Sequence, residues 1–504
     1  MTSTASVLRL ASADNVLLAR DDLASGAVLP DGGTTREAVP RGHKVAAADI
    51  EAGAPIRRYG QIIGFAARTI HAGEHVHVHN VELRAFERHG ETGVDATPLE
   101  RIEPSATFQG IVRPDGRVAT RNYLGVVSTV NCSATVSRAI ADRMGRELEG
   151  HPSIDGVVAL THASGCGMAT ESEAMDVLRR TIGGFVEHVN FAGVLLIGLG
   201  CEDNQISRLI ETQDIVRGDR LRTTTLQDTG GTRATIDWGV AALREMVPDA
   251  ARAIRTTVPA SALTLALQCG GSDGYSGVTA NPALGACVDL LVRHGGTAVL
   301  SETPEIYGAE HLLTRRAVSQ AVADRLLDRI RWWEDYTARL GAEMNNNPSP
   351  GNKEGGLTTI LEKSLGAVAK GGTTNLVAVY EYAERIATHG LTFMDTPGYD
   401  PVSATGQVAG GANLICFTTG RGSAFGCKPV PSIKLATNTP MYLRMQDDMD
   451  VDCGTILSGN ASIADVGARI FELVLRVASG ERSKSEALGY GDQEFAPWIL
   501  GATM

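Results

Sequence analysis

The sequence has few aromatic residues, few lysines and few cysteines, and it contains no long apolar run. Aromatic side chains make up 5% of its 504 residues, charged ones 21% and hydrophobic ones 43%. No uninterrupted apolar stretch reaches the roughly 20 residues that a membrane-spanning helix needs. The N-terminal segment mixes Ser, Thr, Asp and Arg and lacks the apolar core of a signal peptide. We therefore expect a soluble, cytoplasmic protein of roughly two to four domains.

The charge balance and the missing motifs exclude several function classes. A formal net charge of −12 disfavours binding to nucleic acid or to an anionic membrane, so we expect neither as a partner. No Gly-x-Gly-x-x-Gly follows the first strand of the α/β region, and no Walker A or Gly-x-Ser-x-Gly sequence occurs. A dinucleotide-dependent oxidoreductase therefore remains only a disfavoured alternative, which nucleotide titration would test.

The few lysines and cysteines are unevenly placed. Seven lysines stand against 39 arginines, and none lies between Lys44 and Lys353, which suggests that some lysines carry chemistry that arginine cannot. Eight cysteines are too few for a disulfide scaffold. In a reducing compartment such thiols are metal ligands, catalytic groups or small core residues. Five lie beside glycine or asparagine in predicted turns: Cys132, Cys166, Cys201, Cys269 and Cys427.

Residues 1–85 predict a small all-β domain, because short β-like runs alternate there with Gly, Pro and Asp turns. The one candidate helix in this region is Arg36–Val39. Residues 86–108 are polar, contain proline and are predicted to be a linker. The predicted strands are Asn15–Ala19, Val45–Ala46, Pro55–Arg57, Ile62–Ala67 and His75–Asn80.

The rest of the chain predicts an α/β fold with mainly parallel sheets, divided into regions 109–255 and 256–504. Apolar runs lead into Gly-rich polar loops at Leu124–Thr129, Gly156–Thr161, Phe191–Leu199 and Leu263–Leu267. Units of this kind build parallel sheets, whose ligands bind beyond the carboxyl ends of the strands. The alternative is that the Gly-Cys pairs only pack tightly at strand ends. The polar residues expected to converge at one edge are Cys132, Cys166, Cys201, Cys269, His162, Glu202, Asp203, Asn204 and Asp273.

A histidine repeat is the sharpest local feature. On a strand, side chains alternate between faces, so His75, His77 and His79 are expected on one face. Because they repeat about every 7 Å along an extended strand, the three cannot bind one ion unless the strand bends. Two of them, joined by His43 or His71 from a neighbouring strand, can, and imidazole suits Fe²⁺, Mn²⁺ or Zn²⁺. The alternative is a solvated polar face.

Two later loops are candidate substrate-binding segments. Thr418–Gly422 follows an apolar run and offers backbone N–H groups and the Arg421 guanidinium to a carboxylate. Residues 347–356 form a long loop without apolar content, and such loops are usually functional or disordered. Lys353 and Glu354 favour a functional role for it.

Eight segments carry recognisable motifs: Arg41–Lys44, Gly73–Asn80, Asp115–Tyr123, Val130–Thr135, His162–Gly167, Gly200–Gln205, Cys269–Gly274 and Pro348–Gly355. Together they resemble the altronate and galactarate dehydratase family, and the resemblance extends from about Asn15 to Trp498. It implies an N-terminal SAF (β-clip) domain followed by a large catalytic part. It also implies Fe²⁺- or Mn²⁺-dependent removal of water from a sugar acid, giving a 2-keto-3-deoxy acid.

Two segments, Gly420–Lys434 and Met449–Gly454, resemble the altronate branch, and the galactarate branch carries other residues at Cys427 and Cys453. The resemblance thus implies conversion of D-altronate to 2-dehydro-3-deoxy-D-gluconate and water, with galactarate dehydratase as the alternative. A sulfolactate sulfo-lyase branch usually carries its SAF domain on a separate chain, so the fusion here counts against it. A non-catalytic sugar-acid-binding regulator is the alternative from another class.

Dehydration of a sugar acid requires removal of a weakly acidic proton beside a carboxylate. A chelating divalent metal acts as a Lewis acid, while a base and an acid complete the elimination. We assign His43, His75 and His77 as metal ligands or acid–base residues, with His79 as a weaker metal candidate. Lys434 is assigned to catalysis or carboxylate binding. The candidate substrate-binding residues are Arg421 for the carboxylate and Asn131, Asp203, Asn204 and Asp273 for hydroxyls.

An iron–sulfur cluster on Cys132, Cys166, Cys201 and Cys269 is the alternative cofactor, since it would supply the same Lewis-acid function. The spacing, with one cysteine per loop, matches no compact ferredoxin-type run, so the sequence favours a metal ion on the histidines. The expected partners are a small-molecule sugar acid and a second copy of the chain in a homodimer.

Overall fold

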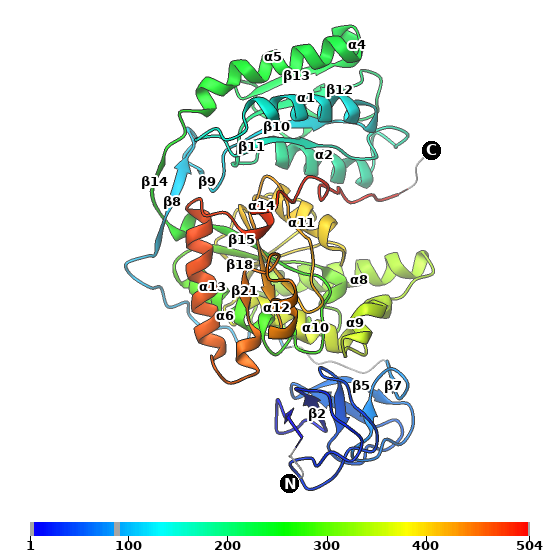
Figure 1. The fold of residues 1–504 in the computed structure, drawn as a ribbon. Coiled ribbons are helices and arrows are strands. Elements are labelled where there is room, and N and C mark those ends of the chain that lie inside the picture. Colours follow the sequence, from blue (N-terminus) through cyan, green and yellow to red (C-terminus); the bar gives the residue numbers. More distant parts are fainter. Residues whose placement is uncertain (1–4, 85–90, 502–504) are drawn as a thin grey trace.

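The computed structural model describes residues 5–84 and 91–501, which form three parts (Figure 1). The β domain (residues 5–84, blue) contacts the C-terminal domain (residues 260–501), and the middle domain (residues 107–259) lies at the opposite end. The predicted fold class, a small all-β domain followed by an α/β region with mainly parallel sheets, is confirmed. Among the described residues, no helix is long and apolar enough to cross a membrane.

Two antiparallel sheets, with strand orders β1-β2-β3-β6 and β4-β5-β7, make up the β domain. Four of the five predicted strands are present, with ends shifted by no more than one residue; the fifth, His75–Asn80, is a strand only at His75–Val76. The segment Arg36–Val39 is extended rather than helical, and Val39 bridges to Leu23. The strands are β1 (Val7–Leu8), β2 (Val16–Ala19), β3 (Lys44–Ala46), β4 (Pro55–Arg58), β5 (Gln61–Ala66), β6 (His75–Val76) and β7 (Val81–Glu82).

The predicted linker 86–108 is partly ordered against the C-terminal domain. Residues 85–90 lie outside the described residues. Further along, the Asp95 carboxylate pairs with Arg315 at 2.6 Å. Residues 107 and 108 already belong to β8 (Thr107–Val112), which pairs with β9 (Val118–Ala119) and β14 (Arg255–Pro259). Strand pairing therefore begins before the predicted linker ends.

The middle domain has a four-stranded parallel sheet of order β11-β10-β12-β13. Its central strand is buried along its whole length, as expected for a continuous apolar run with helices on both faces. The strands are β10 (Tyr123–Ser128), β11 (Gly156–Leu160), β12 (Phe191–Gly198) and β13 (Leu221–Thr225). The helices are η1 (Asn131–Ser133), α1 (Ala134–Glu147), α2 (Glu173–Val186), α3 (Ile206–Thr212), α4 (Leu226–Thr229) and α5 (Thr232–Ala250).

The C-terminal domain has a seven-stranded parallel sheet of order β17-β18-β16-β15-β19-β20-β21. Its strands are β15 (Thr264–Cys269), β16 (Thr297–Leu300), β17 (Leu376–Tyr380), β18 (Gly390–Met394), β19 (Leu414–Thr419), β20 (Ser432–Ala436) and β21 (Val451–Asp452). The α-helices are α6 (Ala280–Arg293), α7 (His311–Thr314), α8 (Gln320–Arg339), α9 (Pro350–Glu354), α10 (Ile360–Val368), α11 (Asp400–Ala409), α12 (Thr439–Arg444), α13 (Ile463–Ala478) and α14 (Lys484–Ala487). Short 3-10 turns are η2 (Ala260–Ala262), η3 (Thr303–Glu305), η4 (Met344–Asn346), η5 (Ala369–Gly371) and η6 (Gly454–Ile456).

Strand β15 lies between β16 and β19, and the chain adds strands first on one side of it and later on the other. The boundary between β15 and β19 is thus the topological switch point, where open parallel sheets bind ligands beyond the strand ends. The loops that leave the sheet there and at β20 carry Asp273, Arg421 and Asn438.

The β domain shares an apolar core with the C-terminal domain. Ile56, Ile63 and Ile70 are fully buried in the same cluster as Leu365 and Val368 of α10. Burial of a large aliphatic side chain contributes about 1.5–3 kcal/mol. This shared core fixes the β domain against the carboxyl edge of the seven-stranded sheet.

Candidate active site

Three histidines of the β domain meet where it faces the C-terminal domain. His43 Nδ1 lies 3.0 Å from His75 Nε2, and the His43 and His77 ring centroids are 4.7 Å apart. One ligating nitrogen from each of His43, His75 and His77 lies within 4.8 Å of the others. His79 is exposed, with its ring 5.5 Å from that of His75, and His71 is exposed beside Asp49.

The predicted strand His75–Asn80 is wrong beyond its first two residues, because Asn80 closes a turn. The buried Asn80 side chain accepts a hydrogen bond from the His77 N–H at 2.9 Å and donates one to the His75 carbonyl at 2.9 Å. The backbone N–H of Asn80 also donates to the His77 carbonyl. The turn stacks the rings of His75 and His77, with centroids 5.3 Å apart and planes at 18°. The bend required for two histidines of this repeat to share an ion is therefore present.

Burial keeps these imidazoles neutral near pH 7. It lowers the pKa of His75 to about 4 and that of His77 to about 3, and it also lowers the pKa of His43. Neutral imidazole is the metal-binding form, and His77 Nδ1 is buried without a hydrogen-bond partner. An unpaired buried nitrogen costs about 1–3 kcal/mol, which a bound cation would remove. The three residues thus fit a divalent transition metal.

A buried ionic group of Glu362, Lys44 and Arg58 lies next to the His43 turn. Glu362, at the start of α10, pairs with Lys44 at 2.9 Å and with Arg58 at 2.5 Å. Lys44 also donates to the Gly356 carbonyl at 2.6 Å, and Arg58 to the Gly274 carbonyl at 2.5 Å. Lys44 follows His43 directly in sequence, so these contacts hold the His43 turn against the C-terminal domain.

Glycines allow the His43 turn to approach the opposing loops closely. A Cβ atom at Gly274 would lie 1.9 Å from the Gly42 carbonyl oxygen, and one at Gly356 would lie 2.2 Å from the same atom. His43 Nε2 in turn lies 3.1 Å from the Glu354 carbonyl oxygen. The segment 347–356, interpreted from the sequence as a functional loop, contains the short helix α9, begun by a Ser349–Asn352 capping box.

A cleft of about 220 Å³ opens beside the His43 turn, at the switch point of the sheet. Residues from both domains line it, and three arginines face it: Arg41 from the β domain, Arg421 from the loop after β19 and Arg444 from α12. Arg421 is half-exposed and pairs with Glu354 at 3.2 Å, whereas no side-chain ion pair of Arg41 or Arg444 occurs among the described residues. Two guanidinium groups are therefore open to an anionic ligand.

Asp273 lies in the wall of the cleft and is hydrogen-bonded on both oxygens. Its carboxylate accepts from Thr437 Oγ1 at 3.0 Å, Asn438 Nδ2 at 3.1 Å, Ser276 Oγ at 3.1 Å and the Tyr275 N–H at 3.0 Å. Burial nevertheless raises the pKa of Asp273. Asp273 thus ties the loops after β15 and β20 together, and it places Asn438 beside the cleft.

Lys434 lies beneath the Arg421 loop rather than in the cleft wall. It is fully buried in β20, donates to the Ser423 carbonyl at 3.0 Å and sits over the Tyr490 ring at 5.1 Å. Burial lowers the pKa of Lys434. Its hydrogen bond to the Ser423 carbonyl holds the loop that carries Arg421.

The expected convergence of all βα loops at one edge does not occur, because the loops belong to two separate sheets. The loops at the carboxyl edge of the middle-domain sheet carry Asn131, Asp203 and Asn204 together with Cys132, Cys166 and Cys201. The middle domain lies at the opposite end of the molecule from the β domain (Figure 1). Asp273, Arg421 and Cys269 belong to the C-terminal sheet. His162 and Glu202 are buried and bond to strand-end backbone in the middle domain.

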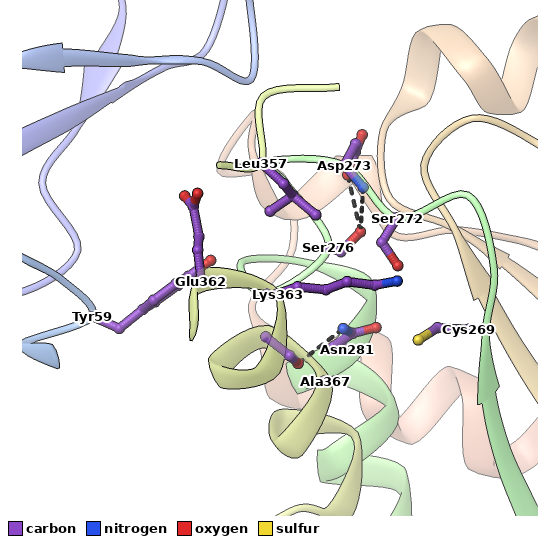
Figure 2. A pocket seen from close by; sticks show the side chains of 12 residues that line it. Tyr59, Cys269, Ser272, Asp273, Ser276, Asn281, Leu357, Glu362, Lys363 and Ala367 are labelled. Atoms are coloured by element: carbon purple, nitrogen blue, oxygen red, sulfur yellow. Dashed lines mark hydrogen bonds between the residues drawn. The ribbon is translucent and has the colours of Figure 1, made fainter. Parts of the chain in front are cut away.

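Cys269 is separated from the other candidate cluster cysteines and lies in a buried ionic group of its own. Lys370 Nζ lies 2.9 Å from Cys269 Sγ and 3.0 Å from Glu302, and Lys363 pairs with Glu305 at 2.7 Å. Figure 2 shows Glu362 and Lys363 leaving the start of α10 in different directions, with Lys363 on the side that carries Cys269. Lys370 and Lys363 therefore supply counter-charges to the two carboxylates of this group.

Sequence reasoning missed Glu362, Arg41 and Arg444. The scarcity of lysine was the available signal for the ionic groups, since Lys44, Lys363, Lys370 and Lys434 are all buried. Their acidic partners cannot be read from the sequence: Lys44 and Glu362 are 318 residues apart.

Comparison with known proteins agrees with this architecture. Residues 5–84 match the altronate/galactarate dehydratase SAF domain, residues 110–251 the second domain of D-galactarate dehydratase/altronate hydrolase, and residues 260–503 the C-terminal D-galactarate/altronate dehydratase domain. A galactarate dehydratase (L-threo-forming) of Escherichia coli strain K12 is 40% identical over 95% of this chain and 94% of its own. An altronate dehydratase of Bacillus subtilis strain 168 is 34% identical over 99% of this chain and 100% of its own, and one of E. coli strain K12 is 33% identical over 99% of each. The resemblance predicted from the motifs is confirmed: the chain belongs to the D-galactarate/altronate dehydratase family of sugar-acid dehydratases and is a hydro-lyase.

Proposed function

We propose that this chain removes water from a sugar acid in the cleft between the β domain and the C-terminal sheet, giving a 2-keto-3-deoxy acid. The observation that carries the proposal is the juxtaposition of three neutral imidazoles with a cleft that holds two unpaired guanidinium groups. A hydroxy acid needs an anchor for its carboxylate and a base for the proton beside it. The arginines of the cleft supply the first, and the adjoining histidines supply the second. Release of 2-keto-3-deoxy acid from galactarate or altronate by the purified protein tests this assignment.

The proposed cofactor is Fe²⁺ or Mn²⁺, held by His43, His75 and His77, with His79 at the exposed rim. Bound there, the ion would supply Lewis-acid stabilisation of the charge that develops when the proton beside the carboxylate leaves. Metal analysis of the purified protein and of a His77→Ala variant tests the binding set independently of turnover. Equal metal content in the two proteins would contradict it.

The chain's own residues bind, orient and exchange protons. Arg41 and Arg444 bind carboxylate oxygens. Asn438 and Tyr275, which also line the cleft, orient hydroxyls. An imidazole whose lone pair binds the ion cannot also accept a proton, so the base is a histidine of this group that does not ligate the ion. Arg421, which also lines the cleft, is a further carboxylate-binding candidate, and Lys434 positions its loop through the Ser423 carbonyl. Lys434→Met is therefore expected to raise KM more than it lowers kcat.

We propose galactarate as the preferred substrate. A dicarboxylate needs a cation at each end, and Arg41 and Arg444 come from different domains that both line the cleft. The relative with 40% identity is a galactarate dehydratase. Altronate is the second candidate, favoured by the segments Gly420–Lys434 and Met449–Gly454 and by altronate dehydratases that match 99% of this chain.

Paired kinetics on the two acids distinguish these candidates. Arg444→Leu should reduce kcat/KM for galactarate by tenfold or more, about 1.4 kcal/mol, and that for altronate by less, because altronate has a single carboxylate. Arg252→Leu, an exposed arginine of the middle domain, is the matched control and should change neither. A preference of the unmodified protein for altronate would support the second candidate.

Two further predictions from the sequence remain proposals. The homodimer is tested by light scattering of the purified chain. The cytoplasmic location is tested by fractionation of the producing cells.

A further inference from the structure

The carboxylate of Glu354 already contacts one of the three arginines that line the cleft. It pairs with the Arg421 guanidinium at 3.2 Å, and both residues belong to the cleft wall. We propose that Glu354 competes with the substrate for Arg421 and thereby limits to two the number of substrate carboxylates that the cleft accepts. The inference rests on the proposed function, because it concerns the substrate of that same cleft.

Glu354 projects into the cleft from a fixed backbone. It is the last residue of α9, which Figure 1 shows at the end of the C-terminal domain that faces the β domain. Its carbonyl oxygen lies 3.1 Å from His43 Nε2, and the next carbonyl, that of Gly355, accepts a hydrogen bond from the Gly274 N–H at 2.7 Å. The backbone of Glu354 is therefore held by both domains, and its side chain is the part that can move.

The loop that carries Arg421 is also fixed by its backbone. The N–H groups of Gly420 and Arg421 both donate to the Gly271 carbonyl, at 3.1 and 3.0 Å. The Gly422 N–H donates to Thr419 Oγ1 at 3.0 Å. The pair thus joins two fixed backbones through two flexible side chains. A ligand carboxylate can replace Glu354 on Arg421 by side-chain rotation alone.

The other two acids of the cleft are engaged differently. Asp22 accepts a hydrogen bond from the backbone N–H of Arg41 at 2.9 Å, and the Asp273 carboxylate accepts the four hydrogen bonds described above. Within residues 5–84 and 91–501, Glu354 is thus the one acid of this cleft whose carboxylate pairs with a guanidinium of the cleft. The competition for an arginine is therefore specific to Glu354.

The exposure of the pair makes it displaceable. The Glu354 side chain is 71% exposed and that of Arg421 is 49% exposed, and such pairs are weak because water solvates both partners. A dicarboxylate anchored by Arg41 and Arg444 leaves the pair intact. A third carboxylate has to break the pair before it can use Arg421. Glu354 thereby matches the open positive charge of the cleft to a dicarboxylate.

Two carboxylic acids without hydroxyl groups serve as probes, since neither can lose water. Adipate has the six-carbon dicarboxylate chain of galactarate, and tricarballylate carries three carboxylates. Isothermal titration calorimetry of the purified full-length protein measures both dissociation constants. We expect the unmodified protein to bind adipate more tightly than tricarballylate, and Arg444→Leu to weaken the binding of adipate.

Three variants separate competition for Arg421 from a general effect of charge. Glu354→Gln keeps the shape of the side chain, and the ratio of tricarballylate to adipate affinity should rise by about tenfold, the effect of one charge-assisted hydrogen bond. Asp22→Asn is the matched control, because it removes an exposed carboxylate of the same cleft that contacts no guanidinium, and it should change the ratio far less. The double variant Glu354→Gln/Arg421→Gln lacks both the competitor and the third anchor, so its ratio should return to that of the unmodified protein.

The outcomes distinguish this inference from the proposed function. An unchanged ratio in Glu354→Gln, an equal rise in Asp22→Asn, or a rise that persists in the double variant would overturn the role of Glu354. Equal binding of adipate to the unmodified protein and to Arg444→Leu would overturn the location of the substrate site, and this inference with it. Conversion of galactarate by Glu354→Gln together with an unchanged ratio would overturn this inference alone.

Discussion

Removal of the Glu362 charge is the sharpest test of how the site is assembled. Glu362 is fully buried with Lys44 and Arg58, and it also accepts from the N–H and hydroxyl of Thr358 at 2.9 and 2.7 Å. Glu362→Gln keeps the shape of the side chain but leaves two buried cations without a counter-charge. Breaking such a buried pair costs about 3–5 kcal/mol.

The pKa of Lys44 sets the scale of this loss. Burial has already lowered it from 10.5 to about 8, which at about 1.4 kcal/mol per tenfold change in acidity corresponds to about 3 kcal/mol. Without Glu362 the pKa falls further, and once it is below 7 the lysine loses its proton. That event limits the total cost for Lys44 to about 5 kcal/mol at pH 7, so removal of Glu362 adds at most about 2 kcal/mol at this residue. Arg58 remains charged, so it contributes the rest of the loss.

Scanning calorimetry at pH 7 measures the effect. At about 3 °C per kcal/mol for a unit of 150–250 residues, the transition that includes the β domain should fall by roughly 10 °C. Glu481→Gln, which removes a half-exposed partner of Arg476, is the matched control and should cost less than about 1 kcal/mol. Adding Lys44→Met to Glu362→Gln should restore at least about 1 kcal/mol. A loss below about 1 kcal/mol, or a further loss in the double variant, would refute the reasoning.

Three further predictions concern the metal, the histidine turn and acid stability. Chelation should abolish turnover and added Fe²⁺ or Mn²⁺ should restore it; full activity of metal-free protein would exclude the proposed mechanism. Asn80→Ala should release the turn that stacks His75 on His77 and weaken metal binding at least tenfold in a titration, with thermal stability reported alongside. Burial lowers the pKa of His188 to about 4, so the unfolded chain binds a proton between pH 6.5 and 4 that the folded chain does not. Stability should therefore fall as the pH drops through this range, by about 3 kcal/mol from this residue, and His188→Gln should flatten the melting-temperature profile while the exposed His389→Gln should not.

Local patterns predicted the elements of this fold well. Continuous apolar runs followed by Gly-rich loops predicted parallel strands at Leu124–Thr129 and Phe191–Leu199, and both are buried central strands. The sequence also divided the α/β part into regions 109–255 and 256–504, but the same patterns did not indicate that the loops of the two regions lie at the edges of two separate sheets. Hydrophobic periodicity describes each strand but not its neighbours, so residues such as Asn204 and Asp273 were expected together and are apart.

Side-chain interactions explain the remaining differences in the site. The strand predicted at His75–Asn80 ends after Val76 because the Asn80 side chain bonds to backbone groups, and alternation alone gives no warning of that. Arg421 was found because it lies in a distinctive Gly-Arg-Gly loop. Arg444 lies on an ordinary helix turn, and only the tertiary structure brings it to the cleft.

The shared apolar core and the buried ionic group hold the β domain and the C-terminal domain together by non-covalent contacts alone. The contacts that assemble the site lie within residues 5–84 and 260–501, so chain continuity contributes mainly an effective concentration. Two separately produced fragments, ending and beginning in the segment 85–106, should therefore associate and rebuild the cleft once their concentration exceeds the dissociation constant of that surface. For the same reason, the two domains could be encoded on one gene or on two, because the residues of the site would keep their positions across the same interface.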